Sequence, residues 1–292
     1  MAINAVIMAA GTSSRFAPLS HEIPKGLIEV RGEILIERQI RQLKEAGVDE
    51  IVLVLGYRKE QFEYLKGKFG VKTVINPDYL TRNNNASIWA ARSFLHNTFI
   101  CSSDNYFSQN PFVDDTSEAY YAGVYSKGET KEWCMHENSD GLIDQVTIGG
   151  KGAWYMLGHA FWNEAFSKRF LTILEKEYDL PQTANKYWEN IFIEHLAELP
   201  MKIRRYPDDI IFEFDTLDEL RDFDPSYWAD SRCALLRENA KVLNCSERDI
   251  TDIIAFHDGN ADAAGYRFRK GPDFYEYRYD DKSLRSVDND YR

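Results

Sequence analysis

Short apolar runs alternate with amphipathic segments along the first three quarters of the chain. The apolar runs predict buried strands, because a strand covered on both faces is apolar at nearly every position. The segments between them carry apolar residues at the spacing of one helix face. The predicted strands span residues 3–9, 51–55, 71–75, 98–102 and 203–206, and the predicted helices span 34–47, 59–69, 86–95, 164–177, 185–198 and 217–223. This alternation predicts an α/β fold built on a doubly wound, mostly parallel, Rossmann-like sheet.

Two stretches depart from this alternation. Residues 120–125 and 133–146 have the pattern of antiparallel strands, and they predict a small antiparallel subregion beside the main sheet. Later, a predicted helix over 233–244 precedes a polar end of the chain that is rich in Tyr and Arg. We therefore predict a main domain over residues 1–230 and a C-terminal extension over 231–292. Three interpretations of the extension stay open: a truncated relic, a regulatory flap, or a dimerisation arm that would make the protein a homodimer.

Charge and composition exclude several classes of protein. Acidic residues outnumber basic ones by 47 to 35, so the formal net charge is -12. This excess disfavours non-specific binding to nucleic acid or to an anionic membrane. No apolar run reaches the ~20 residues of a membrane span, and the first residues lack the basic start of a signal peptide. The four cysteines form no C-x-x-C pair. We expect a cytoplasmic protein with no nucleic-acid partner and no membrane insertion.

A glycine-led loop follows the first predicted strand. A triphosphate close to a backbone needs a residue without Cβ and a row of free N–H donors, and Gly11 with the small residues after it provides both. Arg15 can direct two donors at phosphate oxygens. Ten residues further on, Pro24-Lys25 adds a point positive charge. The loop alone also fits an ordinary turn between strand and helix. The predicted strand, Gly11, Arg15 and Pro24-Lys25 together favour a phosphate site.

Two aspartates follow extended runs of the chain. Asp104 comes just after the predicted strand 98–102, and Asp215 ends the run 210–214. Carboxylates at the carboxyl ends of parallel strands lie over the crevice where such sheets bind ligands. Two of them suit a Mg²⁺ ion that also bridges phosphate oxygens. Glu213 shares a face with Asp215. A helix cap or a loop is the alternative role, since Asp favours both.

The motif Ala9-Ala10-Gly11, Arg15 and Pro24-Lys25 resembles the signature of the sugar-phosphate and alcohol-phosphate nucleotidyltransferases. Most members of that family carry a second glycine at the position of Ser13. Further stretches, within about residues 3–225, are similar to the bacterial CTP:phosphocholine cytidylyltransferases. These stretches are Gly56–Leu65, Asn83-Asn84 with Ser87, Asp104–Tyr106, Glu132-Trp133, Tyr187–Asn190 and Glu213–Asp215.

The resemblance implies an enzyme that transfers a cytidylyl group from CTP to phosphocholine with Mg²⁺, giving CDP-choline and pyrophosphate. The phosphate oxygen of the acceptor would attack the α-phosphorus in line. The resemblance also implies the site: Ala9, Ala10, Gly11, Thr12, Asn83 and Ser87 bind the nucleotide, Arg15 and Lys25 are catalytic, and Asp104 and Asp215 hold the metal. For the asparagines, helix capping and turn formation are the alternative.

The acceptor is assigned to aromatic residues with a carboxylate beside them. A quaternary ammonium has no N–H to donate, so aromatic faces hold it, helped by nearby carboxylates. Trp133, Tyr187, Trp188 and Glu189 fit this chemistry and match the choline-type subfamily. Packing in the core is the alternative for the tryptophans. Two other functions also stay open: transfer to phosphoethanolamine, 2-aminoethylphosphonate or a sugar 1-phosphate, and nucleotide sensing without catalysis.

Overall fold

The computed structural model describes residues 2–113, 116–259 and 262–288, and the chain forms two compact units. The main unit contains Met1–Gly11 and Leu35–Glu213, and the second unit contains Thr12–Ile34 and Phe214–Arg292. This division differs from the predicted boundary at residue 230, because the extension packs with two earlier segments of the chain. Within the described residues, no helix is both long and apolar enough to span a membrane.

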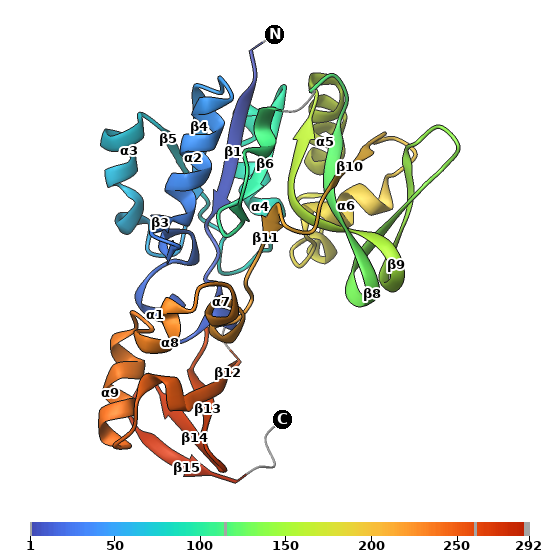
Figure 1. Cartoon of the computed structure of the whole chain (residues 1–292). Coiled ribbons are helices and arrows are strands. Elements are labelled where there is room, and N and C mark those ends of the chain that lie inside the picture. The colour runs from blue at the N-terminus through green and yellow to red at the C-terminus, as the bar shows by residue number, and fades with distance from the viewer. Residues whose placement is uncertain (1, 114–115, 260–261, 289–292) are drawn as a thin grey trace. The chain divides into compact units, whose positions relative to one another are not determined.

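The main unit is built on a seven-stranded sheet (Figure 1). Four of its neighbouring pairs are parallel, and the two pairs that involve β9 with β6 and with β8 are antiparallel. The predicted α/β fold with a mostly parallel sheet is therefore confirmed. In spatial order the strands are β10 (Lys202–Tyr206), β8 (Tyr120–Glu137), β9 (Ile143–Trp162), β6 (Thr98–Ser102), β1 (Asn4–Ala9), β4 (Glu50–Leu55) and β5 (Lys72–Ile75).

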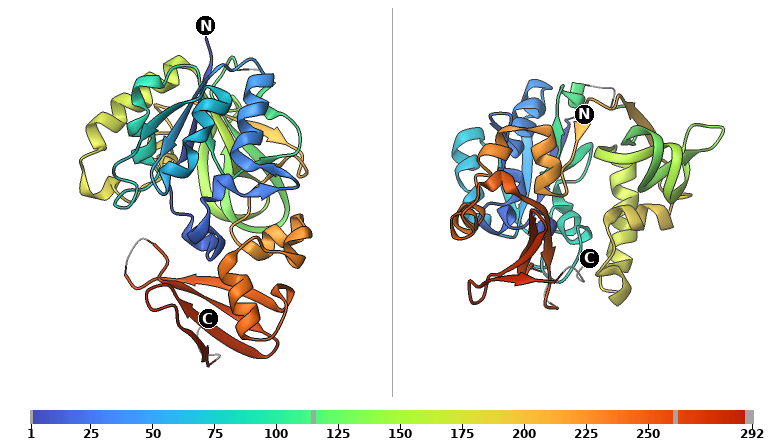
Figure 2. Two further views of the ribbon diagram at one scale, coloured as in Figure 1. Left: turned by 90° about the vertical axis from the view of Figure 1, so that its left-hand side faces the viewer. Right: turned by 60° about the horizontal axis from the view of Figure 1, so that its bottom comes forward.

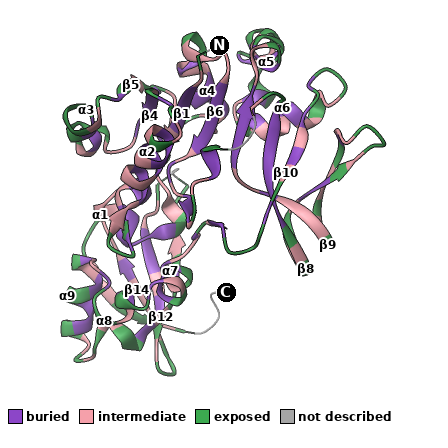
Figure 3. Ribbon diagram, turned by 45° about the horizontal axis from the view of Figure 1, so that its top comes forward, coloured by how far each residue is buried: buried purple, intermediate pink, exposed green. Residues whose placement is uncertain are grey.

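The centre of this sheet is apolar because both of its faces are covered. Val52 to Leu55 of β4 are 0% exposed, as are Ala5 to Ile7 of β1 (Figure 3). In the helix over Leu35–Glu45, the buried face consists of Ile36, Ile40 and Leu43, at the spacing that the sequence predicts. The α-helices of this unit are α2 (Leu35–Glu45), α3 (Tyr64–Phe69), α4 (Asn85–Ala90), α5 (Glu164–Glu177) and α6 (Trp188–Glu194).

Strands β8 and β9 form a long hairpin, so the prediction of one strand over 133–146 is wrong. The chain turns between Glu137 and Ile143, where the Asn138 side chain accepts hydrogen bonds from the N–H groups of Asp140 and Leu142. Gly141 has a φ of +74°, a left-handed conformation that glycine adopts without steric cost. The predicted antiparallel subregion exists, and it is larger than its prediction.

The second unit consists of short elements and a four-stranded antiparallel sheet in the order β12-β13-β14-β15. Its longest helix, α9 (Ala234–Val242), lies against that sheet in both views of Figure 2. Asn239 of α9 donates a buried hydrogen bond to the hydroxyl of Tyr266 in β13. The other elements are α1 (Leu19–Glu22), α7 (Leu217–Phe223), α8 (Ser226–Ala229), β12 (Ile250–Phe256), β13 (Gly265–Lys270), β14 (Asp273–Arg278) and β15 (Leu284–Val287).

A buried histidine lies in an aromatic cage of the main unit. His159 is 0% exposed, and its Nε2 lies 3.2 Å from the hydroxyl of Tyr120. The rings of Phe99, Phe107 and Phe112 surround it at centroid distances of 5.1–5.9 Å. Burial, with the nearby positive charge of Arg204, lowers the pKa of His159 to about 3. The folded protein therefore keeps this imidazole neutral.

We expect this histidine to make the protein less stable in acid. Below pH 6.5 the unfolded chain protonates His159 and the folded chain does not, so stability falls as pH drops from about 6.5 toward 3. The loss approaches about 1.4 kcal/mol per pH unit. Urea unfolding between pH 7 and pH 4.5 measures it, with His159→Gln as a variant that does not titrate. Equal slopes for the two proteins would contradict the assignment.

Candidate active site

The glycine-led loop and Asp104 lie at one edge of the main sheet. Strands β1 and β6 are parallel neighbours, with Met8 opposite Ser102, so both strands end at the same edge. The N–H of Ser103 donates to the carbonyl of Met8 at 3.1 Å, which ties the two strand ends together. The predicted nucleotide loop at Gly11 and the predicted metal ligand Asp104 thus leave the sheet side by side, as expected for a ligand site in a parallel sheet.

The carbonyl of Ala10 is fixed by a glycine in the next strand–helix turn. Tyr57 N–H donates to the Ala10 carbonyl at 3.0 Å. A Cβ on Gly56 would stand 2.8 Å from that same oxygen and 2.7 Å from the ring of Tyr79, so only glycine fits there. A Cβ on Gly11 would meet nothing within 4 Å. The packing around Ala9 and Ala10 is therefore closed, while space beside Gly11 is free for a ligand.

Ser13 replaces the glycine of most family members in a left-handed conformation. Its φ is 51° and its ψ is 42°, in the region that glycine enters without steric cost. The serine therefore preserves the backbone path that a glycine would take. Thr12, the preceding predicted nucleotide ligand, is partly exposed.

The second unit pairs a predicted catalytic cation with a predicted metal ligand. Arg15 Nη1 lies 2.7 Å from Asp215 Oδ2, and both side chains are well exposed to solvent. The Asp215 N–H donates to the Glu219 carboxylate at 2.7 Å. Thr216 caps α7 by accepting from the Glu219 N–H at 3.2 Å. The start of α7 thus fixes the backbone of Asp215, while Arg15 neutralises its charge.

Lys25 is a largely buried cation in the second unit. It follows Pro24 in a single turn of 3₁₀ helix and is only 6% exposed. Its Nζ stands 5.7 Å from the centroid of the Phe16 ring. Burying an ammonium group carries a desolvation cost. Lys25 is therefore not an ordinary solvent-exposed lysine, and its catalytic role stays a prediction.

The backbone around Asp104 is held by a buried glutamine. Gln39 Nε2 donates to the carbonyls of Ser102 and Asn105 at 2.9 Å each. Asn105 Nδ2 in turn donates to Glu213 at 3.3 Å. Asp104 itself is partly exposed, and a carboxylate oxygen is a ligand that Mg²⁺ prefers. Asp104 belongs to the main unit and Asp215 to the second, so their joint binding of one metal ion stays a prediction.

Asn83 and Ser87 occupy the two ends of one packed turn in the main unit. Asn83 bonds twice to the loop before α6, through its N–H to Ala184 at 2.8 Å and through its amide to Asn185 at 3.3 Å. The hydroxyl of Ser87 accepts a hydrogen bond from Asn76 at 3.2 Å, and Ser87 as a residue is 4% exposed. Asn83 keeps an exposed fraction for a ligand, while Ser87 is mostly engaged within the protein. Their contact with a base stays a prediction.

Glu189 is the centre of a polar cluster at the start of α6. It accepts hydrogen bonds from Asn84 Nδ2 at 3.1 Å and from the Tyr121 hydroxyl at 3.2 Å. Burial raises the pKa of Glu189 to about 7, although both hydrogen bonds act to lower it. Sequence reasoning missed Tyr121 and assigned no specific role to Asn84. The run of asparagines over 83–85 was a signal for Asn84, but nothing in the sequence distinguishes Tyr121 from the other tyrosines.

The three aromatic candidates for the acceptor lie in different environments. Trp133 is partly buried, and its ring meets that of Tyr187 edge to face at 5.9 Å. Tyr187 is 44% exposed. Trp188 is instead 1% exposed and packs against Trp162 at 5.0 Å. This burial favours the packing alternative for Trp188, because the turn that exposes Tyr187 directs the next side chain inward. A direct contact of Trp188 with the acceptor stays a prediction.

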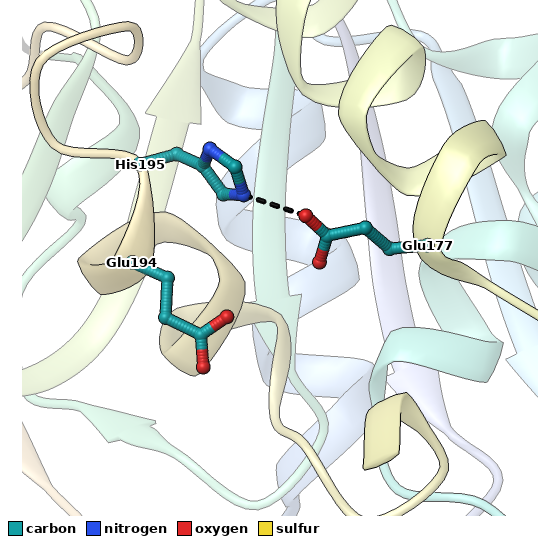
Figure 4. A group of neighbouring side chains, drawn as sticks. All are labelled: Glu177, Glu194 and His195. Carbon is teal, nitrogen blue, oxygen red and sulfur yellow. Dashed lines mark hydrogen bonds and ion pairs between the residues drawn. The ribbon is translucent and has the colours of Figure 1, made fainter. Parts of the chain in front are cut away.

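A separate cluster of side chains in the main unit has ligands suited to a metal ion. Glu177, Glu194 and His195 place one ligand atom each within 4.8 Å of one another (Figure 4). Lys186 Nζ, however, lies 2.5 Å from Glu194 and 3.9 Å from Glu177. Burial alone would lower the pKa of His195, but Glu198 and Glu177 raise it. Lys186 already pairs with Glu194 and Glu177, and His195 bonds to Glu177 and Glu198, so this cluster is a network of polar side chains that pair with one another.

Comparisons with known proteins assign the chain to a family. Residues 5–156 match the family model of the MobA-like NTP transferase domain. The choline-phosphate cytidylyltransferase of Streptococcus pneumoniae is 32% identical over 219 residues, which cover 75% of this chain and 96% of that protein. The 2-aminoethylphosphonate cytidylyltransferase of Lancefieldella rimae is 36% identical over 228 residues, covering 77% and 93%.

A solved structure agrees with these sequence matches. The CTP:phosphocholine cytidylyltransferase from Streptococcus pneumoniae superposes with a TM-score of 0.74 at 31% identity, over 77% of this chain and 99% of that one. The expected resemblance is therefore confirmed over the whole length of the relatives. The chain belongs to the MobA-like NTP transferase family and is a nucleotidyltransferase.

Proposed function

We propose that this enzyme transfers the cytidylyl group of CTP to phosphocholine, releasing CDP-choline and pyrophosphate. The observation that supports it most is the match to the choline-phosphate cytidylyltransferase of Streptococcus pneumoniae, which extends over 96% of that protein and includes the fold. The nucleotide would be bound where the strand ends of β1 and β6 meet, by Ala9, Ala10, Gly11 and Thr12 with Asn83 and Ser87 near the base.

The reaction needs positioning and charge neutralisation more than proton transfer. The phosphate monoester is already a nucleophile at neutral pH, so one of its oxygens attacks the α-phosphorus in line and pyrophosphate leaves. Lys25 and Arg15 would stabilise the negative charge of the triphosphate. Asp104 and Asp215 would hold Mg²⁺, which supplies Lewis-acid stabilisation of the phosphoryl oxygens when bound. Arg15 Nη1 and Asp215 Oδ2 are paired at 2.7 Å, and the second carboxylate oxygen and the other guanidinium donors would be the groups that take these roles.

The acceptor group would lie beside Trp133, Tyr187 and Glu189. The edge-to-face pair of Trp133 and Tyr187 offers aromatic surface, and Glu189 is two residues from Tyr187 at the start of the same helix. A trimethylammonium group carries its charge without any N–H, so aromatic faces and a nearby carboxylate suit it. Trp188 would support this pocket from the core.

Transfer to 2-aminoethylphosphonate is the second candidate. The Lancefieldella rimae relative named for that acceptor matches over 93% of its length. A primary ammonium donates hydrogen bonds, which Glu189 could accept when it is ionised. Release of pyrophosphate from CTP with phosphocholine, phosphoethanolamine, 2-aminoethylphosphonate and sugar 1-phosphates separates the candidates. We expect phosphocholine to give the highest kcat/KM; a higher value for another acceptor would overturn the choline assignment.

We expect Trp133→Ala to raise the KM for phosphocholine by about tenfold, since a desolvated cation–π contact contributes about 1–2 kcal/mol. The KM for CTP should stay within twofold. Trp154→Ala is the matched control, because Trp154 is also a partly buried tryptophan of the β8–β9 hairpin and contacts Tyr125 rather than Tyr187. Equal effects of the two variants on the acceptor KM would show that Trp133 acts only through the hairpin's stability.

A further inference from the structure

The signature segment, Thr12–Ile34, has too little regular structure to hold its own shape. Its helices η1 (Ser14–Phe16), α1 and η2 (Lys25–Leu27) have three or four residues each. Its strands β2 (Glu29–Val30) and β3 (Glu33–Ile34) have two residues each. Elements of this length are not stable alone, because helix nucleation is unfavourable and a two-residue hairpin buries little surface. Yet the segment carries Arg15 and Lys25. Something else must fix its conformation.

The C-terminal extension, residues 231–292, contacts this segment at several points. The carboxylate of Glu22 accepts hydrogen bonds from the N–H groups of Ala234 at 2.9 Å and Leu235 at 2.8 Å. These donors belong to the first turn of α9, where four N–H groups lack a partner within the helix and the helix dipole favours a negative charge. Glu22 thus caps a helix that lies over 200 residues away in the sequence.

Two neighbouring contacts strengthen this attachment. The imidazole of His21 stacks on the ring of Tyr279, with a centroid distance of 3.8 Å and an angle of 9° between the planes. Arg232 donates to the carbonyl of Glu29 at 3.0 Å. The residues that the extension holds therefore flank Lys25 on both sides in the sequence.

The Streptococcus pneumoniae relative has no room for an equivalent of this extension. The match to the Streptococcus pneumoniae enzyme uses 96% of that protein but only 75% of this chain. The relative has too few remaining residues to form the α9 helix and the four-stranded sheet. Packing of the extension on the signature segment is therefore a property of this chain beyond the shared fold.

We propose that the extension positions the signature segment for CTP binding, with Glu22 as the positioning residue. Glu22 is assigned no part in binding substrate or metal; its carboxylate joins the segment to the N-terminus of α9 and so sets the place of Lys25, three residues further on. The inference depends on the proposed nucleotidyl transfer only in taking CTP as the nucleotide. It makes no assumption about the acceptor.

The test compares Glu22→Ala with a variant that weakens the extension elsewhere. Asn239→Ala removes a buried hydrogen bond to Tyr266 inside the extension and leaves every residue of Thr12–Ile34 unchanged. For each protein, calorimetry without acceptor gives the Kd for CTP with Mg²⁺, and thermal unfolding gives the Tm. We expect Glu22→Ala to raise the Kd about tenfold or more, Glu22→Gln to restore part of the loss, and Asn239→Ala to lower the Tm with a Kd within twofold of the wild type.

Hydrogen–deuterium exchange provides a readout that needs no ligand. We expect Glu22→Ala to speed exchange across Thr12–Ile34 in the free protein at a temperature well below its Tm, and Asn239→Ala to leave that segment unchanged. Unchanged exchange in Glu22→Ala would overturn the proposal, and so would equal effects of the two variants on the Kd. If the wild type binds no CTP, the proposed function fails, while the exchange result still decides whether Glu22 positions the segment.

Discussion

We expect turnover to fall by about 10²–10³-fold when Lys25 is replaced by methionine, the range found when one charge-stabilising donor is removed from an active site. Residue Lys25 is 6% exposed and its Nζ stands 5.7 Å from the centroid of the Phe16 ring, so little water competes with a bound triphosphate for its charge. Methionine keeps most of the apolar stem and removes the charge. The Tm of the variant shows separately whether the fold is kept.

Steady-state kinetics with CTP and phosphocholine, together with the Tm, measure this effect. Lys127→Met is the control, since Lys127 has an 83% exposed side chain at 3.6 Å from Asp208. Lys25→Arg should recover little activity, because a planar guanidinium does not fill the place of a compact ammonium group. Turnover of Lys25→Met within threefold of the wild type would remove Lys25 from the mechanism.

Asp104→Asn should lower kcat by about 10²–10³-fold, equivalent to the several kcal/mol of charge stabilisation that a bound metal ion supplies. The substitution keeps the size of the side chain, and Gln39 still holds the carbonyls on either side of position 104. The fold should therefore survive. The loss of one anionic ligand should also raise the Mg²⁺ concentration needed for half-maximal activity.

Titration of activity with Mg²⁺ distinguishes this role from a structural one. Asp144→Asn serves as the control, because Asp144 is an exposed carboxylate on β9 and belongs to the same unit. A variant that loses turnover but keeps the wild-type Mg²⁺ dependence would show that Asp104 orders the loop rather than binding the ion.

The parallel core was predictable because its strands and helices have clear periodicity. Periodicity predicts burial directly for two sets of residues: the apolar run from Ile51 to Leu55, and Ile36, Ile40 and Leu43 at helical spacing. Both sets are buried in the structure. The turn at Asn138 also carried a signal, since asparagine and glycine favour such turns, but the alternating residues around it dominated the interpretation. The sequence pattern could not decide whether Trp188 lies in a pocket or in the core, because an aromatic residue next to an acidic one fits both equally well.

Local pattern predicts two helices of the second unit, over 217–223 and 233–244, but not the contacts that assemble this unit. The contact of Glu22 with α9, and the burial of Arg221 between the carbonyls of Ile250 and Glu247, depend on the path of the whole chain. No periodicity marks either residue. Local pattern therefore identifies candidate residues at the ends of regular strands, but not the contacts of irregular segments that meet only after folding.

The partnership of Glu22 with α9 has a consequence for how the protein is made. Glu22 and Ala234 are 212 residues apart in the sequence. At about 5–20 residues per second, the newly synthesised signature segment therefore exists without α9 for roughly 10–40 s. Every strand of the main sheet, through β10 at Lys202–Tyr206, is synthesised before Ala234. A chain that ended between these two points would contain all strands of that sheet and lack the partner that holds Glu22.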